Sequence, residues 1–140
     1  MQAKTFSGFP TSDWSVLASK PVELMEGDLE EILDLQRNLM LECRADEIPD
    51  DLLLYITLNN IIGESTEAAA FFGDITKPWK KSLGISLDEV QEELIDILHF
   101  LLQAFIIVGM DAAAVMELYR IKNRVNFRRI KAKREESEGV

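Results

Sequence analysis

Four acidic residues stand in two pairs at helical spacing, Glu64 with Glu67 and Glu93 with Asp96. Residues three apart lie on one face of a helix, so each pair would direct two carboxylates the same way. Both pairs lie in stretches that otherwise read as core, where burying carboxylates without a counter-charge would be very costly. Two such helices side by side therefore predict a cation between them.

Oxygen-only ligands favour Mg²⁺ over zinc, with Mn²⁺ as the alternative. Such an ion can polarise a phosphoryl oxygen and lower the pKa of a bound water. A carboxylate that the metal does not fully use could take the proton from the attacking water, and Glu64 and Glu67 are our candidates for this base. The sequence therefore predicts metal-assisted hydrolysis of a phosphoanhydride.

Two other interpretations of the acids stay open. Acids three residues apart are common on solvated helices, so one pair alone would be weak evidence for a metal site. A di-iron bundle is the other metal option, but its helices carry Glu-x-x-His pairs. Here the third-position partners are Glu67 and Asp96, and His99 follows only three residues beyond Asp96. This makes the di-iron reading the weaker one.

The basic residues cluster near the C-terminus, where eight of the fifteen occur without an intervening acid: Arg120, Lys122, Arg124, Arg128, Arg129, Lys131, Lys133 and Arg134. The net charge of −10 argues against binding a nucleic-acid polymer, because duplex affinity depends on cations that neutralise phosphates. A local positive patch in an acidic protein suits a small polyanion better. Lys122, Asn126 and Arg129 continue the apolar face of their helix and are the predicted phosphate ligands.

Aromatic and amide side chains near the acids are candidates for contacting a nucleobase. Trp79 and Phe100 could stack on a base, and Gln36 and Asn38 could read its edge. Gln36 could equally form a hydrogen bond between helices, and both readings stay open. His99 is a further base-binding candidate, although a lone histidine on a core helix is more often a packing residue.

The apolar periodicity predicts four helices and no strand. They are expected from 28 to between 44 and 49, from 50 or 51 to about 72, from 86 to 108, and from 112 into the charged tail. Ser86 followed by Glu89 is a capping-box signature, and Gly73 and Gly109 are predicted stops. Four helices with short connections make an all-α four-helix bundle.

Length and composition indicate one domain. We expect an irregular arm over 1–27, a helical-bundle catalytic domain over 28–131 and a polar tail over 132–140. Cys43 is the single cysteine, so no internal disulfide can form, which suits a reducing cytoplasm. The most hydrophobic run, 97–108, is too short to span a bilayer. The start, Met1 to Pro10, has no apolar core of signal-peptide length, so we expect a cytoplasmic protein without a membrane partner.

Two segments resemble a known superfamily. Glu-x-x-Glu, a gap of 25 residues and then Glu-x-x-Asp resembles the signature of the all-α nucleoside triphosphate pyrophosphatases, which include MazG and the dimeric dUTPases. The segment from Glu93 to Leu102 looks like the second acidic motif of the dimeric dUTPases, with its His-Phe continuation. The segment from Lys122 to Ile130 looks like their series of phosphate-binding Lys, Asn and Arg residues.

The resemblance implies an activity and a set of roles. It implies hydrolysis of dUTP to dUMP and diphosphate by a homodimer or homotetramer. It also implies that Mg²⁺ is bound by all four acids, phosphates by Lys122, Asn126 and Arg129, and the base by Gln36, Trp79 and Phe100.

The first motif, Gly63 to Ala69, is less leucine-rich than in dimeric dUTPases, and Trp79 is displaced from its expected place. The base therefore stays open between uracil, cytosine and a broader set. The rivals are a non-catalytic helical partner-binding protein and a relative that binds nucleotide without cleaving it.

Overall fold

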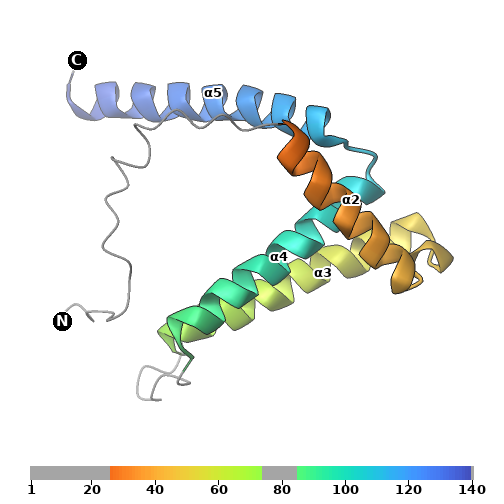
Figure 1. Ribbon diagram of the computed structural model, residues 1–140. Coiled ribbons are helices and arrows are strands. Elements are labelled where there is room, and N and C mark those ends of the chain that lie inside the picture. The colour runs from red at the N-terminus through yellow and green to blue at the C-terminus, as the bar shows by residue number, and fades with distance from the viewer. Residues whose placement is uncertain (1–25, 74–84, 140) are drawn as a thin grey trace.

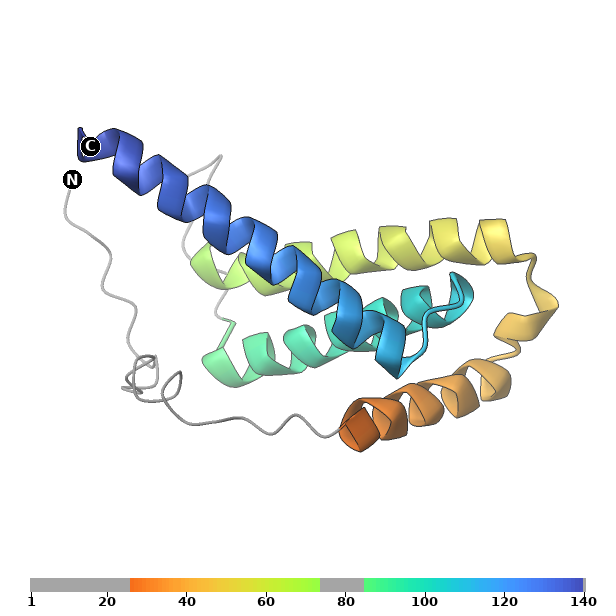
Figure 2. The same cartoon turned by 90° about the horizontal axis from the view of Figure 1, so that it is seen from above.

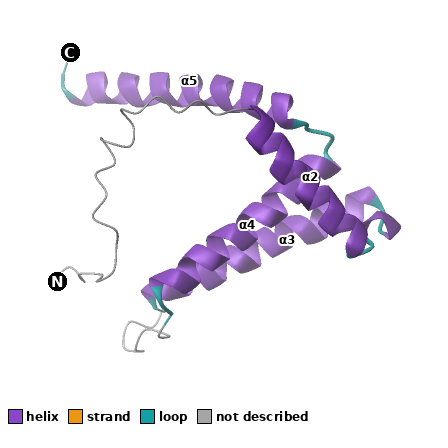
Figure 3. Ribbon diagram, viewed as in Figure 1, coloured by secondary structure: helices purple, strands orange, loops and turns teal. Residues whose placement is uncertain are grey.

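A computed structural model describes residues 26–73 and 85–139 of the chain. Four long helices make up most of it, joined by two short 3-10 helices. They are α2 (Glu26–Glu42), η1 (Ala45–Glu47), α3 (Asp50–Ala69), η2 (Ala70–Phe72), α4 (Leu87–Ile107) and α5 (Ala112–Ser137). Figure 3 shows no strand in these ranges. The predicted all-α class with four helices is confirmed, and the helix bounds agree within a few residues.

Local capping chemistry explains where the helices begin and end. The Ser86 hydroxyl accepts the Glu89 amide at 3.3 Å, and the Asp111 carboxylate accepts the Ala114 amide at 2.8 Å. Gly73 and Gly109 follow helix ends with positive φ angles of 78° and 79°, a conformation that favours glycine. The predicted cap at Ser86 and the two predicted glycine stops are therefore confirmed, and Asp111 is a further cap.

Helices α3 and α4 lie side by side and antiparallel, as Figures 1 and 2 both show. Helix α2 packs on α4, and Leu33, Leu102 and Ala112 form a buried cluster that joins α2, α4 and the start of α5. Leu29, Phe105 and Ile106 pack around this cluster. The described core is thus concentrated where these three helices meet.

Helix α5 leaves the other three helices. The chain bends by 106° between α4 and α5, and α5 then packs against α2 (Figure 1). It continues to Ser137, through most of the expected polar tail, because residues 131–137 are mostly good helix formers. Within a single chain, α5 therefore does not lie along the α3–α4 pair.

Two expectations fall largely outside the described residues: the irregular arm over 1–27, of which only the last two residues are described as the start of α2, and most of the loop after Gly73.

None of the described helices is by itself long and apolar enough to cross a membrane. Helices α4 and α5 meet that test only when taken together as a bent pair.

Candidate metal centre

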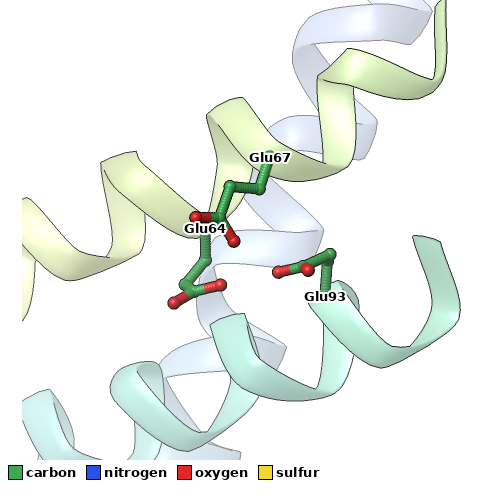
Figure 4. Close-up of side chains that lie close together, drawn as sticks. All are labelled: Glu64, Glu67 and Glu93. Carbon is green, nitrogen blue, oxygen red and sulfur yellow. The ribbon is translucent and has the colours of Figure 1, made fainter. Parts of the chain in front are cut away.

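Three glutamates from two helices converge on one point. Glu64 and Glu67 project from the C-terminal half of α3, and Glu93 projects from the first turns of α4. One carboxylate oxygen of each lies within 4.8 Å of those of the other two. Figure 4 shows the three side chains directed into the space between the helices. The antiparallel packing of α3 and α4 thus brings together three of the four acids predicted as ligands.

The crowding of these carboxylates changes the proton affinity of Glu93. A hydrogen bond with the Glu64 carboxyl group, loss of solvation, and the neighbouring Glu67 carboxylate together raise the pKa of Glu93 from 4.5 to about 7. One oxygen of Glu93, Oε2, is buried and has no hydrogen-bond donor among the described residues. A proton or a cation would relieve this repulsion, and an all-carboxylate donor set suits a hard divalent cation.

Asp96 lies outside this group of three carboxylates. Its side chain is exposed and lines an open hollow on α4 with Asp88 and Glu92. A step of three residues turns an α-helix by about 300°, so Asp96 points about 60° away from Glu93. Its role as a fourth ligand stays a prediction.

The three predicted phosphate ligands, Lys122, Asn126 and Arg129, are exposed on α5. Helical rise and the 106° bend after α4 put the Lys122 backbone roughly 25 Å from that of Glu93. A lysine side chain cannot cover that distance. One chain therefore does not bring the predicted phosphate ligands next to the glutamates.

Gln36 takes part in a buried hydrogen-bond chain across three helices. Its Nε2 donates to Oε1 of Gln103 at 3.4 Å, and Gln103 Nε2 donates to the Thr57 hydroxyl at 2.7 Å. The Thr57 hydroxyl in turn donates to the Leu53 carbonyl at 2.7 Å. The structure thus contains the inter-helix hydrogen bond that was one of the two readings of Gln36. Sequence reasoning gave no role to Gln103 or Thr57, although an amide inside the apolar run of α4 was a usable signal.

The other base-binding candidates are scattered. His99 and Gln36 line a pocket of about 280 Å³ between α2 and α4, and His99 Nδ1 lies 2.9 Å from the Ile95 carbonyl oxygen. His99 follows Glu93 by six residues, which is about 240° around the helix, so this pocket faces away from the glutamates. Phe100 is partly buried on the same side of α4 as Glu93.

Two candidates remain, Asn38 and Trp79. Asn38 is exposed on α2, and Trp79 lies outside the described residues. The four candidates within the described residues therefore do not gather around one point of a single chain.

Comparison with known proteins adds a finding independent of this geometry. No protein-family model matches the chain, and no solved structure matches it. The chain is 35% identical over 97 residues to a dCTP pyrophosphatase of Enterobacteria phage LZ5, a match that covers 61% of this chain and 52% of that protein. It is 46% identical over 41 residues to the dCTP pyrophosphatase of Enterobacteria phage T4, covering 29% and 24%. The chain thus spans about half the length, or less, of these relatives, and the similarity supports a relationship to nucleotide pyrophosphatases.

Proposed function

We propose that this protein is a Mg²⁺-dependent pyrophosphohydrolase of deoxynucleoside triphosphates that releases a monophosphate and diphosphate. The observation that carries the proposal is the convergence of Glu64, Glu67 and Glu93 within 4.8 Å, with no cationic side chain bonded to any of them among the described residues. Three crowded carboxylates are costly without a cation, and a structural role for the fold gives no reason to keep them.

In this proposal the three glutamates hold Mg²⁺, or Mn²⁺ in its place, with Asp96 as the predicted fourth ligand. The bound ion would supply charge for a phosphoryl oxygen and acidify a water molecule. Glu64 or Glu67 would accept the proton of the attacking water at a carboxylate oxygen. Crowding with Glu64 and Glu67 raises the pKa of Glu93 to about 7, and this direction supports a site where a positive charge relieves repulsion between carboxylates.

Two nucleotides are candidate substrates, and a different observation supports each of them. Both phage relatives are named as dCTP pyrophosphatases, which supports dCTP. The acidic and basic motifs resemble those of the dimeric dUTPases, which supports dUTP. We place dCTP first, because it is the substrate named in both relatives.

The proposed substrate contacts remain those expected from the sequence. Lys122, Asn126 and Arg129 would bind the phosphates. The candidates for the base are Gln36, Asn38, Trp79, His99 and Phe100. Because the phosphate ligands lie far from the glutamates of their own chain, the proposal includes a homodimer or homotetramer in which helices of different copies approach one another.

The test is diphosphate release from each of the common deoxynucleoside triphosphates and dUTP, with and without Mg²⁺. We expect Mg²⁺-dependent turnover of dCTP or dUTP. The substitution Glu67→Gln should lower this turnover by at least about 100-fold. Glu42→Gln is the matched control, because Glu42 is an exposed glutamate at the end of α2 and belongs to none of the proposed sites.

Two results would count against the enzyme. One is the absence of turnover with every nucleotide, and the other is equal activity in Glu67→Gln and the control. Isothermal titration without binding of Mg²⁺ or Mn²⁺ would favour a non-catalytic partner-binding protein instead. Binding of nucleotide without product would point to a sequestering protein.

A further inference from the structure

Two contacts fix how α3 and α4 lie against each other. At one of them the Gln103 side-chain amide donates to the Thr57 hydroxyl at 2.7 Å. At the other, the carboxylates of Glu64 and Glu93 belong to the cluster within 4.8 Å (Figure 4). The two helices run antiparallel, so a residue that follows Thr57 lies level with one that precedes Gln103 by the same number. These contacts therefore define which residues face each other between them.

Asn60 and Phe100 lie at the same level of this α3–α4 interface. Asn60 follows Thr57 by three residues, and Phe100 precedes Gln103 by three. Each therefore lies about 4.5 Å along its helix from the Thr57–Gln103 hydrogen bond, in the direction of the glutamates. Phe100 also lies within about 20° of Glu93 around α4. Both side chains are partly buried, which is consistent with a place at the edge of the interface.

Asn60 lies on the same side of α3 as the glutamates. It precedes Glu64 by four residues and Glu67 by seven, so it lies within about 40° of both around the helix and about 6 Å along the axis from Glu64. Its neighbour Asn59 is exposed and donates to the Tyr55 carbonyl at 2.9 Å. Of these two adjacent asparagines, only Asn60 faces the candidate metal centre.

The Asn60 amide is available to a ligand. Its side chain forms no hydrogen bond to any other residue that the structure describes. The Thr57 hydroxyl cannot donate to it, because its one hydrogen goes to the Leu53 carbonyl. Asparagine is also a poorer helix former than alanine or leucine. Neither helix formation nor a contact within the chain therefore accounts for an amide at this position.

We propose that Asn60 reads the edge of the substrate base while Phe100 stacks on the face of that base. With dCTP, Asn60 Nδ2 donates to cytosine N3, and Asn60 Oδ1 accepts from the N4 amino group. The Phe100 ring contributes stacking, which every base can accept. Gln36, which the sequence predicts for this role, lines a pocket that faces away from the glutamates. Asn60 lies on their side and therefore suits a nucleotide whose phosphates are held there.

This inference rests on the proposed function, and a cycle that changes the enzyme and the base in turn tests it. The partner of dCTP is the deoxynucleoside triphosphate of 2-pyrimidinone, which has a hydrogen in place of the N4 amino group. Diphosphate release from both nucleotides is measured with Mg²⁺ for the wild type, for Asn60→Ala and for Asn59→Ala. Asn59→Ala is the matched control, because it removes the neighbouring amide from the exposed side of α3.

The wild type and Asn59→Ala should prefer dCTP in kcat/KM by about 10-fold or more, because the analogue leaves Asn60 Oδ1 without a donor. Asn60→Ala should lower kcat/KM for dCTP by about 10-fold or more, and it should turn over the two nucleotides nearly equally. The same cycle is run with dUTP if that is the better substrate, because 2-pyrimidinone also lacks the oxygen at C4.

Two further measurements separate base reading from a structural role. Asn60→Ala should keep its Tm, because alanine is the better helix former and no internal hydrogen bond of Asn60 is lost. The Mg²⁺ concentration that gives half-maximal activity should stay unchanged, because the glutamates are intact. Circular dichroism shows whether the variant is folded, and Asn60→Ser, with the same expected result, replaces it if it is not.

Two results would overturn this inference while the enzyme stands. One is a wild type that turns over dCTP and the analogue equally well. The other is a folded variant at position 60 that keeps the wild-type preference, whatever its overall activity, because a structural amide lowers kcat/KM for both nucleotides in the same ratio. A chain that turns over no nucleotide at all overturns the proposed function itself, and this inference with it.

Discussion

Replacing Gln36 with leucine is expected to stabilise the fold, which is unusual for a buried residue. Gln36 is only 4% exposed, and its Oε1 has no hydrogen-bond partner among the described residues. The direction of the hydrogen-bond chain explains this. The Thr57 hydroxyl donates its one hydrogen to the Leu53 carbonyl, so it can only accept from Gln103 Nε2. Gln103 then presents its oxygen to Gln36 Nε2, and Gln36 Oε1 is left over.

The magnitude follows from these contacts. A buried acceptor without a partner costs about 1–3 kcal/mol, and leucine removes it. The hydrogen bond that is lost is long, at 3.4 Å, so its loss costs about 0.5 kcal/mol. We expect Gln36→Leu to raise the free energy of unfolding by about 1 kcal/mol, which corresponds to roughly 3–5 °C in Tm.

Gln103→Leu is the matched comparison and should act in the opposite direction. It leaves the Gln36 amide without its acceptor and removes the donor to Thr57. We expect this variant to lose about 2 kcal/mol. Urea unfolding followed by far-ultraviolet circular dichroism measures both. The reasoning would be refuted if Gln36→Leu lost more than about 1 kcal/mol, or if the two variants changed stability in the same direction by similar amounts. If Gln36 also reads the base, the ratio of kcat/KM for dCTP to that for dUTP changes in Gln36→Leu.

Three further predictions concern the glutamates and the core. The pKa of Glu93 is raised in the fold, so the folded state holds a proton between about pH 4.5 and 7 that the unfolded chain has lost, and stability falls as pH rises through that window. Without metal, the Tm of Glu93→Gln should therefore rise relative to that of the wild type between pH 5 and pH 8. A Tm difference between the two proteins that stays constant over this range would contradict the clustering of charge. Adding Mg²⁺ at pH 8 should raise the Tm of the wild type and leave that of Glu93→Gln nearly unchanged, as a thermal melt with increasing Mg²⁺ would show. Leu33→Ala, at a fully buried position, should cost about 2–5 kcal/mol in urea unfolding, whereas Leu35→Ala on exposed α2 surface should cost far less in the isolated chain.

The sequence alone determined the helices and most of their ends, although α5 extends further than expected. Apolar residues at helical spacing predicted α2 to α5, and Ser86, Asp111, Gly73 and Gly109 act within a few residues of themselves as caps or stops. Interactions of this kind depend only on neighbouring residues, so they can be predicted without knowing the rest of the fold. The same holds for the pairing of Glu64 with Glu67, because a helix places residues three apart on one face.

The tertiary structure decided which of these faces meet. The spacing of Glu93 and Asp96 predicts both acids as metal ligands. The rotation of α4 about its axis relative to α3 brings only Glu93 to the cluster and leaves Asp96 exposed. The periodicity of α5 likewise does not predict its direction: the chain bends by 106° before α5, and there Ala112 packs in one buried cluster with Leu33 and Leu102. Helix rotation and crossing angle are set by contacts between residues far apart in the sequence. For that reason the chemistry of this chain could be read from its residues, while the position of its cations relative to its glutamates could not.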